Sequence, residues 1–117
     1  MNQEAPDTRR SSPRVKCRWQ VKCVTEQKKT FTTNAVNVSQ GGIQIVTPVV
    51  FKHDDRLYME IQSYVSGQSH IIKVVGLAVY FSVSTNNETH LGLKFISSLT
   101  MEDSKTLQRY AKVMLGN

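Results

Sequence analysis

The chain has 117 residues, of which 39% are hydrophobic, and this length and composition suit one compact domain with a single core. Its formal net charge is +6, concentrated in the first thirty residues, so we expect an anionic partner near the N-terminus. The longest apolar run, Val74 to Phe81, is too short to span a bilayer, and Met1 to Asp7 have neither the basic head nor the apolar core of a signal sequence. We therefore expect a cytoplasmic protein that does not insert into a membrane.

The N-terminal segment is predicted to be a disordered tail at 1–8 followed by a flexible arm at 9–14. A proline and two serines in the arm oppose regular structure, and the arm carries three arginines, Arg9, Arg10 and Arg14. A guanidinium presents a planar fork of donors that fits a phosphate or the O6/N7 edge of guanine. The arm is therefore predicted to fold over an anionic ligand.

Several short strands follow the arm. Apolar and polar residues alternate from Val15 to Cys23, which predicts a strand with its odd-numbered positions buried. After a polar turn, a second strand is predicted at 30–38, ending in the turn Ser39 to Gly42. Further strands are predicted at 43–46, 57–61, 70–83 and 90–96. In the longest strand, the residues predicted to share a face are Leu77, Val79, Phe81 and Val83.

A helix is predicted only at the C-terminus, over residues 100–115. Thr100 can cap it with Asp103 at the third helical position, and Gly116 can close it. The residues at helical spacing are Leu107, Tyr110, Ala111 and Met114. Short strands followed by one amphipathic helix predict a mainly β fold, with an antiparallel barrel at 15–97 and the helix packed on one opening or side.

The sequence contains no arrangement typical of an enzyme or a metal site. Cys17 and Cys23 lie in the same predicted strand, about 20 Å apart when extended, which is too far for a disulfide. His53, His70 and His90 are scattered, and neither metal-ligand spacing nor a catalytic Ser/His/Asp or Cys/His set occurs. We therefore expect reduced core thiols, no catalytic residue, no metal and no cofactor.

A second candidate segment lies where the second strand turns into the third. Asn37, Ser39 and Gly42 follow the spacing NxSxxG, and their side chains and backbone amides supply short-range donors and acceptors. Gly41 and Gly42 can adopt backbone conformations closed to other residues, which lets amides approach a phosphate closely. With the arginine arm, this turn predicts a divided site, half mobile and half fixed, for a phosphorylated guanine compound.

The ordered pair of motifs, RxxxR at Arg10 and Arg14 and NxSxxG at 37–42, resembles the PilZ domain family. The segment 91–95 is similar to the late GxxF strand of that family, so the resemblance extends through the terminal helix and implies a PilZ-like domain at 9–117. It implies a six-stranded antiparallel β-barrel that binds cyclic di-GMP, a bacterial second messenger. The family converts the concentration of this ligand into a conformational or partner-binding change and catalyses no reaction.

The resemblance also implies roles for single residues. Arg10 and Arg14 would grip guanine edges and phosphates, Asn37 and Ser39 would hydrogen-bond guanine or phosphate, and Gly42, next to Gly41, would keep the turn open. Aspartate is common in the family where this chain has asparagine. An asparagine keeps an acceptor and adds a donor but loses the charge.

Two further positions bear on the number and surroundings of the ligand. A basic residue directly before the first motif, as Arg9 is here, tends in this family to accompany two intercalated cyclic di-GMP molecules. The resemblance therefore implies two ligands per chain. Tyr80 lies near the position where the family often has an aromatic residue beside the ligand.

Two other hypotheses remain open at this point. The chain can be a partner-binding module whose nucleotide site is unused, but such relatives usually lose the arginines and the serine or glycine that are present here. It can also be a basic nucleic-acid-binding barrel, since the charged first strand contains Trp19. The alternation places Trp19 on the inward face, which disfavours nucleic acid. We therefore expect cyclic di-GMP and an unidentified protein as partners.

Overall fold

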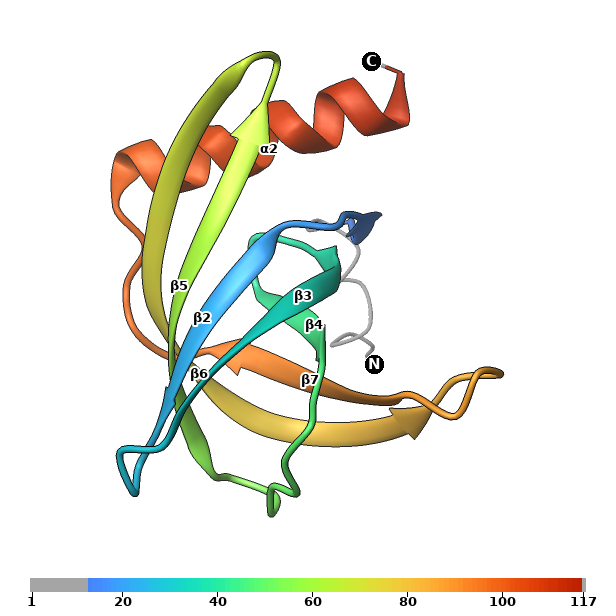
Figure 1. The fold of residues 1–117 in the computed structure, drawn as a ribbon. Coiled ribbons are helices and arrows are strands. Elements are labelled where there is room, and N and C mark those ends of the chain that lie inside the picture. Colours follow the sequence, from blue (N-terminus) through green and yellow to red (C-terminus); the bar gives the residue numbers. More distant parts are fainter. Residues whose placement is uncertain (1–12, 117) are drawn as a thin grey trace, which may run out of the picture.

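The computed structural model describes residues 13–116, which form an antiparallel β-barrel with a helix lying across one end (Figure 1). The strands are β1 (Val15–Lys16), β2 (Gln20–Thr25), β3 (Thr30–Val38), β4 (Gly42–Val46), β5 (Arg56–Val65), β6 (Gln68–Val83) and β7 (Thr89–Phe95). They pair in the order β1-β3-β2-β5-β6-β7-β4, and the pairing of β4 with β3 closes the ring. Because β1 and β2 both pair with β3 as one interrupted strand, the predicted six-stranded barrel is confirmed.

A bulge interrupts the first predicted strand. Lys16 pairs with Asn37 of β3, whereas Gln20 pairs with Asn34, so this strand has one residue more than the stretch of β3 opposite it. The odd-numbered residues remain buried on both sides of the bulge, as the alternation predicts. Alternation alone therefore identifies the strand but does not reveal the break in its pairing.

A second bulge, at Val79 of β6, reverses which side chains face the core. Ala78 pairs with Leu93, and Tyr80 pairs with Gly92, so the register shifts by one residue between them. The predicted common face of Leu77, Val79, Phe81 and Val83 is therefore wrong. The buried residues of β6 are Ile72, Val74, Gly76 and Ala78. The shift turns Tyr80 to the outer side of the barrel.

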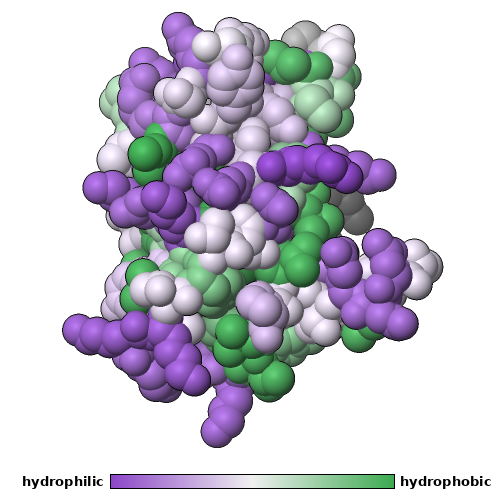
Figure 2. All heavy atoms as spheres, viewed as in Figure 1, coloured by the Kyte–Doolittle hydropathy of each residue, from purple (hydrophilic) through white to green (hydrophobic). Residues whose placement is uncertain are grey.

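The core fills the barrel and continues beneath the helix. Its most completely buried large side chains are Ile45, Leu57, Ile61, Ile72 and Leu91. Both cysteines are buried and unbridged, and burial raises the pKa of Cys17 to about 11 and that of Cys23 to about 12. Both thiols thus stay protonated in the core at neutral pH. On the face shown in Figure 2, hydrophobic atoms form separate patches among hydrophilic ones.

The helix, α2 (Met101–Leu115), begins and ends where the sequence predicts. Thr100 and Asp103 form a capping box, and Gly116 closes the helix with a φ of 77° while its amide donates to the carbonyl of Lys112. The buried helix residues are Asp103, Thr106, Leu107 and Tyr110. The predicted apolar stripe is right at its centre and wrong at its end, because Met114 is 49% exposed. Within residues 13–116, no helix is long and apolar enough to cross a membrane.

Polar contacts tie α2 to three separate parts of the barrel. They are His70 Nε2 with Asp103 Oδ1 at 2.7 Å, Tyr110 Oη donating to the Lys16 carbonyl at 2.6 Å, and Gln40 Nε2 donating to the Ser104 carbonyl at 3.2 Å. Burial alone would raise the pKa of Asp103, but hydrogen bonds from the Thr100 amide and from His70 lower the pKa below its ordinary value. Asp103 is therefore ionised at neutral pH and holds the start of α2 against β6.

Candidate functional site

Neighbouring strands bring five residues into one row on the outer side of the barrel. Register pairs Lys16 on β1 with Asn37 on β3, Asn37 with Gln44 on β4, Gln44 with Gly92 on β7, and Gly92 with Tyr80 on β6. Directly opposed residues of antiparallel strands have Cβ atoms about 4.5–5.5 Å apart. We call these five residues the outer row. The row joins segments that lie far apart in the sequence and rests on rigid strands.

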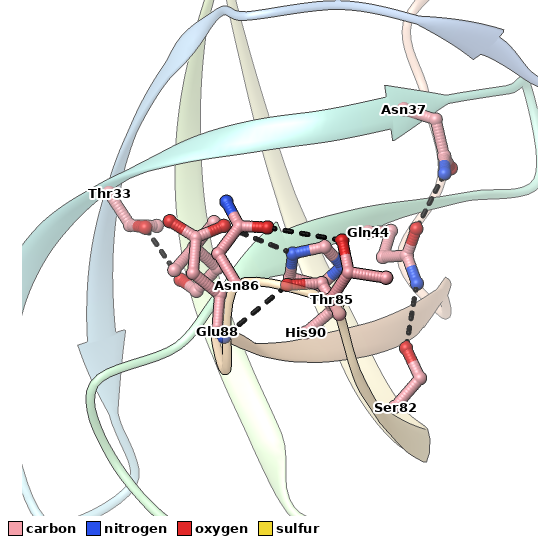
Figure 3. A network of polar contacts seen from close by, with 10 residues as sticks. Thr33, Asn37, Gln44, Ser82, Thr85, Asn86, Glu88 and His90 are labelled. Carbon is pink, nitrogen blue, oxygen red and sulfur yellow. Dashed lines mark hydrogen bonds and ion pairs between the residues drawn. The ribbon is translucent and has the colours of Figure 1, made fainter.

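Side-chain amides in the outer row form a hydrogen-bonded chain. Asn37 Nδ2 donates to Gln44 Oε1 at 2.6 Å, and Gln44 Nε2 donates to Ser82 Oγ at 3.4 Å. Figure 3 shows the three side chains joined across β3, β4 and β6. No hydrogen bond from residues 13–116 reaches Asn37 Oδ1. Among the described residues, Asn37 Oδ1 therefore keeps its capacity to accept a hydrogen bond from a ligand.

Gly92 makes room for the ring of Tyr80. A Cβ at position 92 would lie 2.3 Å from both Cε2 and Cζ of Tyr80, so a side chain there would displace the ring. Arg14 Nη1 donates to the Tyr80 hydroxyl at 2.7 Å, and its guanidinium carbon lies 5.8 Å from the ring centroid. The row thus presents a half-exposed aromatic ring beside a cation and an amide acceptor. Such a surface suits a purine, which can stack on the ring and hydrogen-bond at its edges.

The glycines of the NxSxxG turn owe their role to space rather than to special backbone angles. The turn is closed by Ser39 N donating to Gly42 O at 2.9 Å and by Gly41 N donating to Ser39 Oγ at 3.2 Å. Neither glycine has a positive φ, so the expected unusual conformation is wrong. A Cβ on Gly42 would lie 2.3 Å from the carbonyl oxygen of Leu93, whereas one on Gly41 would meet nothing closer than 4.0 Å. Packing therefore requires a glycine at position 42 but not at position 41.

The structure brings the described members of the predicted site to the same side of the barrel. Arg14 contacts Tyr80, and Tyr80 shares the outer row with Asn37, with Gln44 and Gly92 between them. Ser39 follows β3 by one residue, and it lines a pocket of about 230 Å³ together with Pro13 and residues of α2. The end of the arm therefore lies beside the turn, as a divided site requires. Arg9 and Arg10 lie outside the described residues.

Four residues at the site were not predicted to belong to it, namely Lys16, Gln44, Gly92 and Ser82. Gln44 and Ser82 belong to no motif, and only the strand register places them beside Asn37. A signal for Gln44 was present, because the apolar residues on either side of it predict that its side chain points outward. No comparable signal exists for Ser82, whose orientation depends on the bulge in β6.

Two larger hollows flank the barrel. One of about 810 Å³ is lined by the cations Lys16 and Arg18, by Asn34, and by the pair Glu88 and His90, which lie 3.4 Å apart. It begins at the Lys16 end of the outer row. The other, about 620 Å³, lies over β2, β3, β5 and β6 and contains none of the predicted site residues. No cluster of potential metal ligands occurs within residues 13–116.

Trp19 does not provide a surface for stacking nucleic acid bases. Its side chain is 7% exposed, and its ring packs against Tyr110 of α2 with the centroids 4.4 Å apart. The residue therefore belongs to the contact between barrel and helix, as the alternation predicts.

Comparison with known proteins identifies both a family and a fold. The model of the PilZ domain family matches residues 8–112. No sequence among the curated proteins compared with the chain matches it. The inhibitor of motility MotI/DgrA of Bacillus subtilis superposes with a TM-score of 0.78 at 18% identity, over 91% of this chain and 51% of that chain. This chain thus spans about half of the Bacillus chain.

Two further solved structures with a similar fold were obtained with c-di-GMP. The PilZ domain of YcgR from Escherichia coli has a TM-score of 0.65 and 14% identity, over 92% of this chain and 90% of that chain. The complex of K. pneumonia MrkH has a TM-score of 0.60 and 14% identity, over 90% of this chain and 52% of that chain. At 14% sequence identity, the structural similarity to these proteins establishes the fold of the chain.

Proposed function

Because this chain belongs to the PilZ domain family, we propose that it is a receptor that binds cyclic di-GMP on the outer row and relays the signal to a protein partner. The family match and the c-di-GMP complexes of two similar structures support the ligand class. The observation that carries the proposal is that the two motif segments lie side by side: Lys16, two residues after Arg14, pairs with Asn37, and Arg14 is bonded to Tyr80 on the same row. The proposal involves no catalytic step and places the receptor in the cytoplasm with the second messenger.

In the proposed complex, one guanine stacks against Tyr80 while Arg14 binds its O6/N7 edge or a phosphate. Asn37 Oδ1 accepts from the guanine N1–H and N2–H groups, and Ser39 hydrogen-bonds guanine or phosphate. Arg10 joins Arg14 as the arm orders over the ligand. Each arginine contact to a guanine edge contributes about 1–3 kcal/mol. Ordering the arm costs about 1–2 kcal/mol per residue, which leaves an affinity near the micromolar range.

A second cyclic di-GMP molecule is part of the proposal. Arg9 adds a third guanidinium to the arm, which can stack on or pair with another guanine. The hollow of about 810 Å³ beside the outer row supplies two further cations, Lys16 and Arg18. Against the single carboxylate of Glu88, these two cations leave the hollow with a net positive charge, which favours the added phosphates of an intercalated pair of ligands.

The relay is proposed to run through α2, because both halves of the site contact this helix. Tyr110 binds the carbonyl of Lys16, two residues after Arg14, and Gln40 of the turn binds the carbonyl of Ser104. Ordering of the arm therefore acts directly on the contacts that hold the helix. The C-terminal turn of α2 exposes apolar side chains that a protein partner can cover, namely Val113, Met114 and Leu115.

A calorimetric titration with cyclic di-GMP tests the proposal. We expect saturable binding with a dissociation constant near the micromolar range and two ligands per chain. GTP, which has a guanine and phosphates but lacks the cyclic dinucleotide, is the control and is expected to bind far more weakly. No measurable binding at ~100 μM cyclic di-GMP would refute the proposed function. Binding of one ligand per chain would refute the intercalated pair but not the proposed function.

A further inference from the structure

We infer that Gln44 determines the base specificity of the site. Its hydrogen bond to Asn37 Nδ2 fixes the amide of Asn37 so that Oδ1 faces the ligand, which selects guanine over adenine. The inference rests on the proposed function, since it concerns the base that the outer row recognises. Gln44 acts as a positioning residue, because it works through Asn37.

The two ends of an asparagine amide favour different bases. The pairing edge of guanine offers two neighbouring donors, N1–H and N2–H, while that of adenine offers one donor and the acceptor N1. An outward-facing amide oxygen can accept from both guanine donors. An outward-facing amide nitrogen instead donates to adenine N1. An asparagine that turns freely serves either base, so selectivity requires that one orientation be fixed.

In the structure, Gln44 accepts from Asn37 Nδ2, and this is the orientation that guanine requires. The distance of 2.6 Å between Asn37 Nδ2 and Gln44 Oε1 makes this the tightest contact of the amide chain. Gln44 Nε2 donates to Ser82 Oγ at 3.4 Å, which leaves Gln44 Oε1 as the acceptor for Asn37 Nδ2. Figure 3 shows the amide of Gln44 between Asn37 and Ser82, with one end directed to each. The backbones of all three residues belong to paired strands, which hold the chain rigidly.

Because residue 37 is an asparagine, its side-chain amide needs Gln44 to hold it in one orientation. An aspartate needs no orientation, because both of its oxygens accept hydrogen bonds. The amide of Asn37 presents its acceptor dependably only while Gln44 occupies its nitrogen. The effect of Gln44 should therefore depend on which residue stands at position 37.

The test compares the affinities for cyclic di-GMP and cyclic di-AMP, measured by calorimetry, in matched variants. Gln44→Met keeps the length of the side chain and removes the acceptor, and we expect the preference for guanine to fall about tenfold, the equivalent of one hydrogen bond. Gln44→Glu keeps an acceptor for Asn37 Nδ2, so the preference should persist while the added negative charge weakens both affinities. Far-ultraviolet circular dichroism checks that each variant is folded.

A double-mutant cycle separates positioning from a structural effect. In the Asn37→Asp background, Gln44→Met should leave the base preference unchanged within about twofold, because the aspartate needs no fixed orientation. The same loss of preference in both backgrounds, or an unchanged preference in Gln44→Met alone, would overturn the inference. These outcomes require a wild type that binds cyclic di-GMP. A wild type that binds neither dinucleotide would overturn the proposed function and the inference together.

Discussion

Replacing Arg14 with alanine is expected to weaken cyclic di-GMP binding at least about 30-fold, or ~2 kcal/mol. The guanidinium is proposed to contact the ligand directly, and it also holds the Tyr80 hydroxyl at 2.7 Å. The variant therefore loses both a charged donor and the anchor of the stacking ring. Calorimetric titrations of wild type and Arg14→Ala under identical salt conditions measure the effect.

Arg56→Ala provides the matched control for the arginine variant. Arg56 is an exposed arginine at the start of β5, outside the outer row, and its removal changes the net charge by the same amount. We expect its affinity to stay within about twofold of wild type, because an exposed charge away from the ligand contributes little. Arg14→Ala should unfold at the same temperature as wild type, since Arg14 is exposed. Equal affinities of the two variants would exclude Arg14 from the site.

Replacing Gly42 with alanine is expected to lower the free energy of unfolding by about 2–3 kcal/mol. The added Cβ would lie 2.3 Å from the carbonyl oxygen of Leu93, which is backbone and cannot turn aside. Strand β4 must then move away from β7, and the pairing of these strands completes the barrel. Urea unfolding followed by circular dichroism measures the loss.

Gly41→Ala is the control that tells whether close packing or backbone conformation explains the need for a glycine in this turn. A Cβ there would meet no atom closer than 4.0 Å, and the φ of Gly41 is not positive. The expected change in unfolding free energy is within about 0.5 kcal/mol. If Gly41→Ala were as unstable as Gly42→Ala, the close approach of β4 to β7 would not be the reason for the glycine.

Strands with regular alternation could be predicted closely from the sequence, and those with buried polar residues could not. The predicted strand at 30–38 agrees with β3 at both ends. The strand predicted at 57–61 continues in β5 to Val65, because Ser63 is 1% exposed although it is polar. Its hydroxyl donates to the carbonyl of His70, so the core accepts a residue that breaks the apolar pattern.

The site was accessible to sequence reasoning only in part. The two motifs gave Arg14, Asn37 and Ser39 from spacing and resemblance, because a motif is a local pattern of residue types. The partnership of Asn37 with Gln44, and that of Tyr80 with Gly92, depends on pairing between strands distant in sequence and on the bulge at Val79. Neither the register nor the bulge has a signature in the sequence alone.

Amide chemical shifts of the isotope-labelled protein, followed during a titration with cyclic di-GMP, most directly test whether the outer row is the receptor site. We expect the largest changes at Arg14, Asn37, Gln44 and Gly92, with smaller ones spreading into α2. Residues that line the hollow of about 620 Å³ should stay unchanged. Its strands β2 and β5 lie across the barrel from β4 and β7, and its residues on β3 and β6, at 30–32 and 73–75, lie far along those strands from Asn37 and Tyr80. Largest changes in that hollow, with an unchanged outer row, would contradict the proposed site.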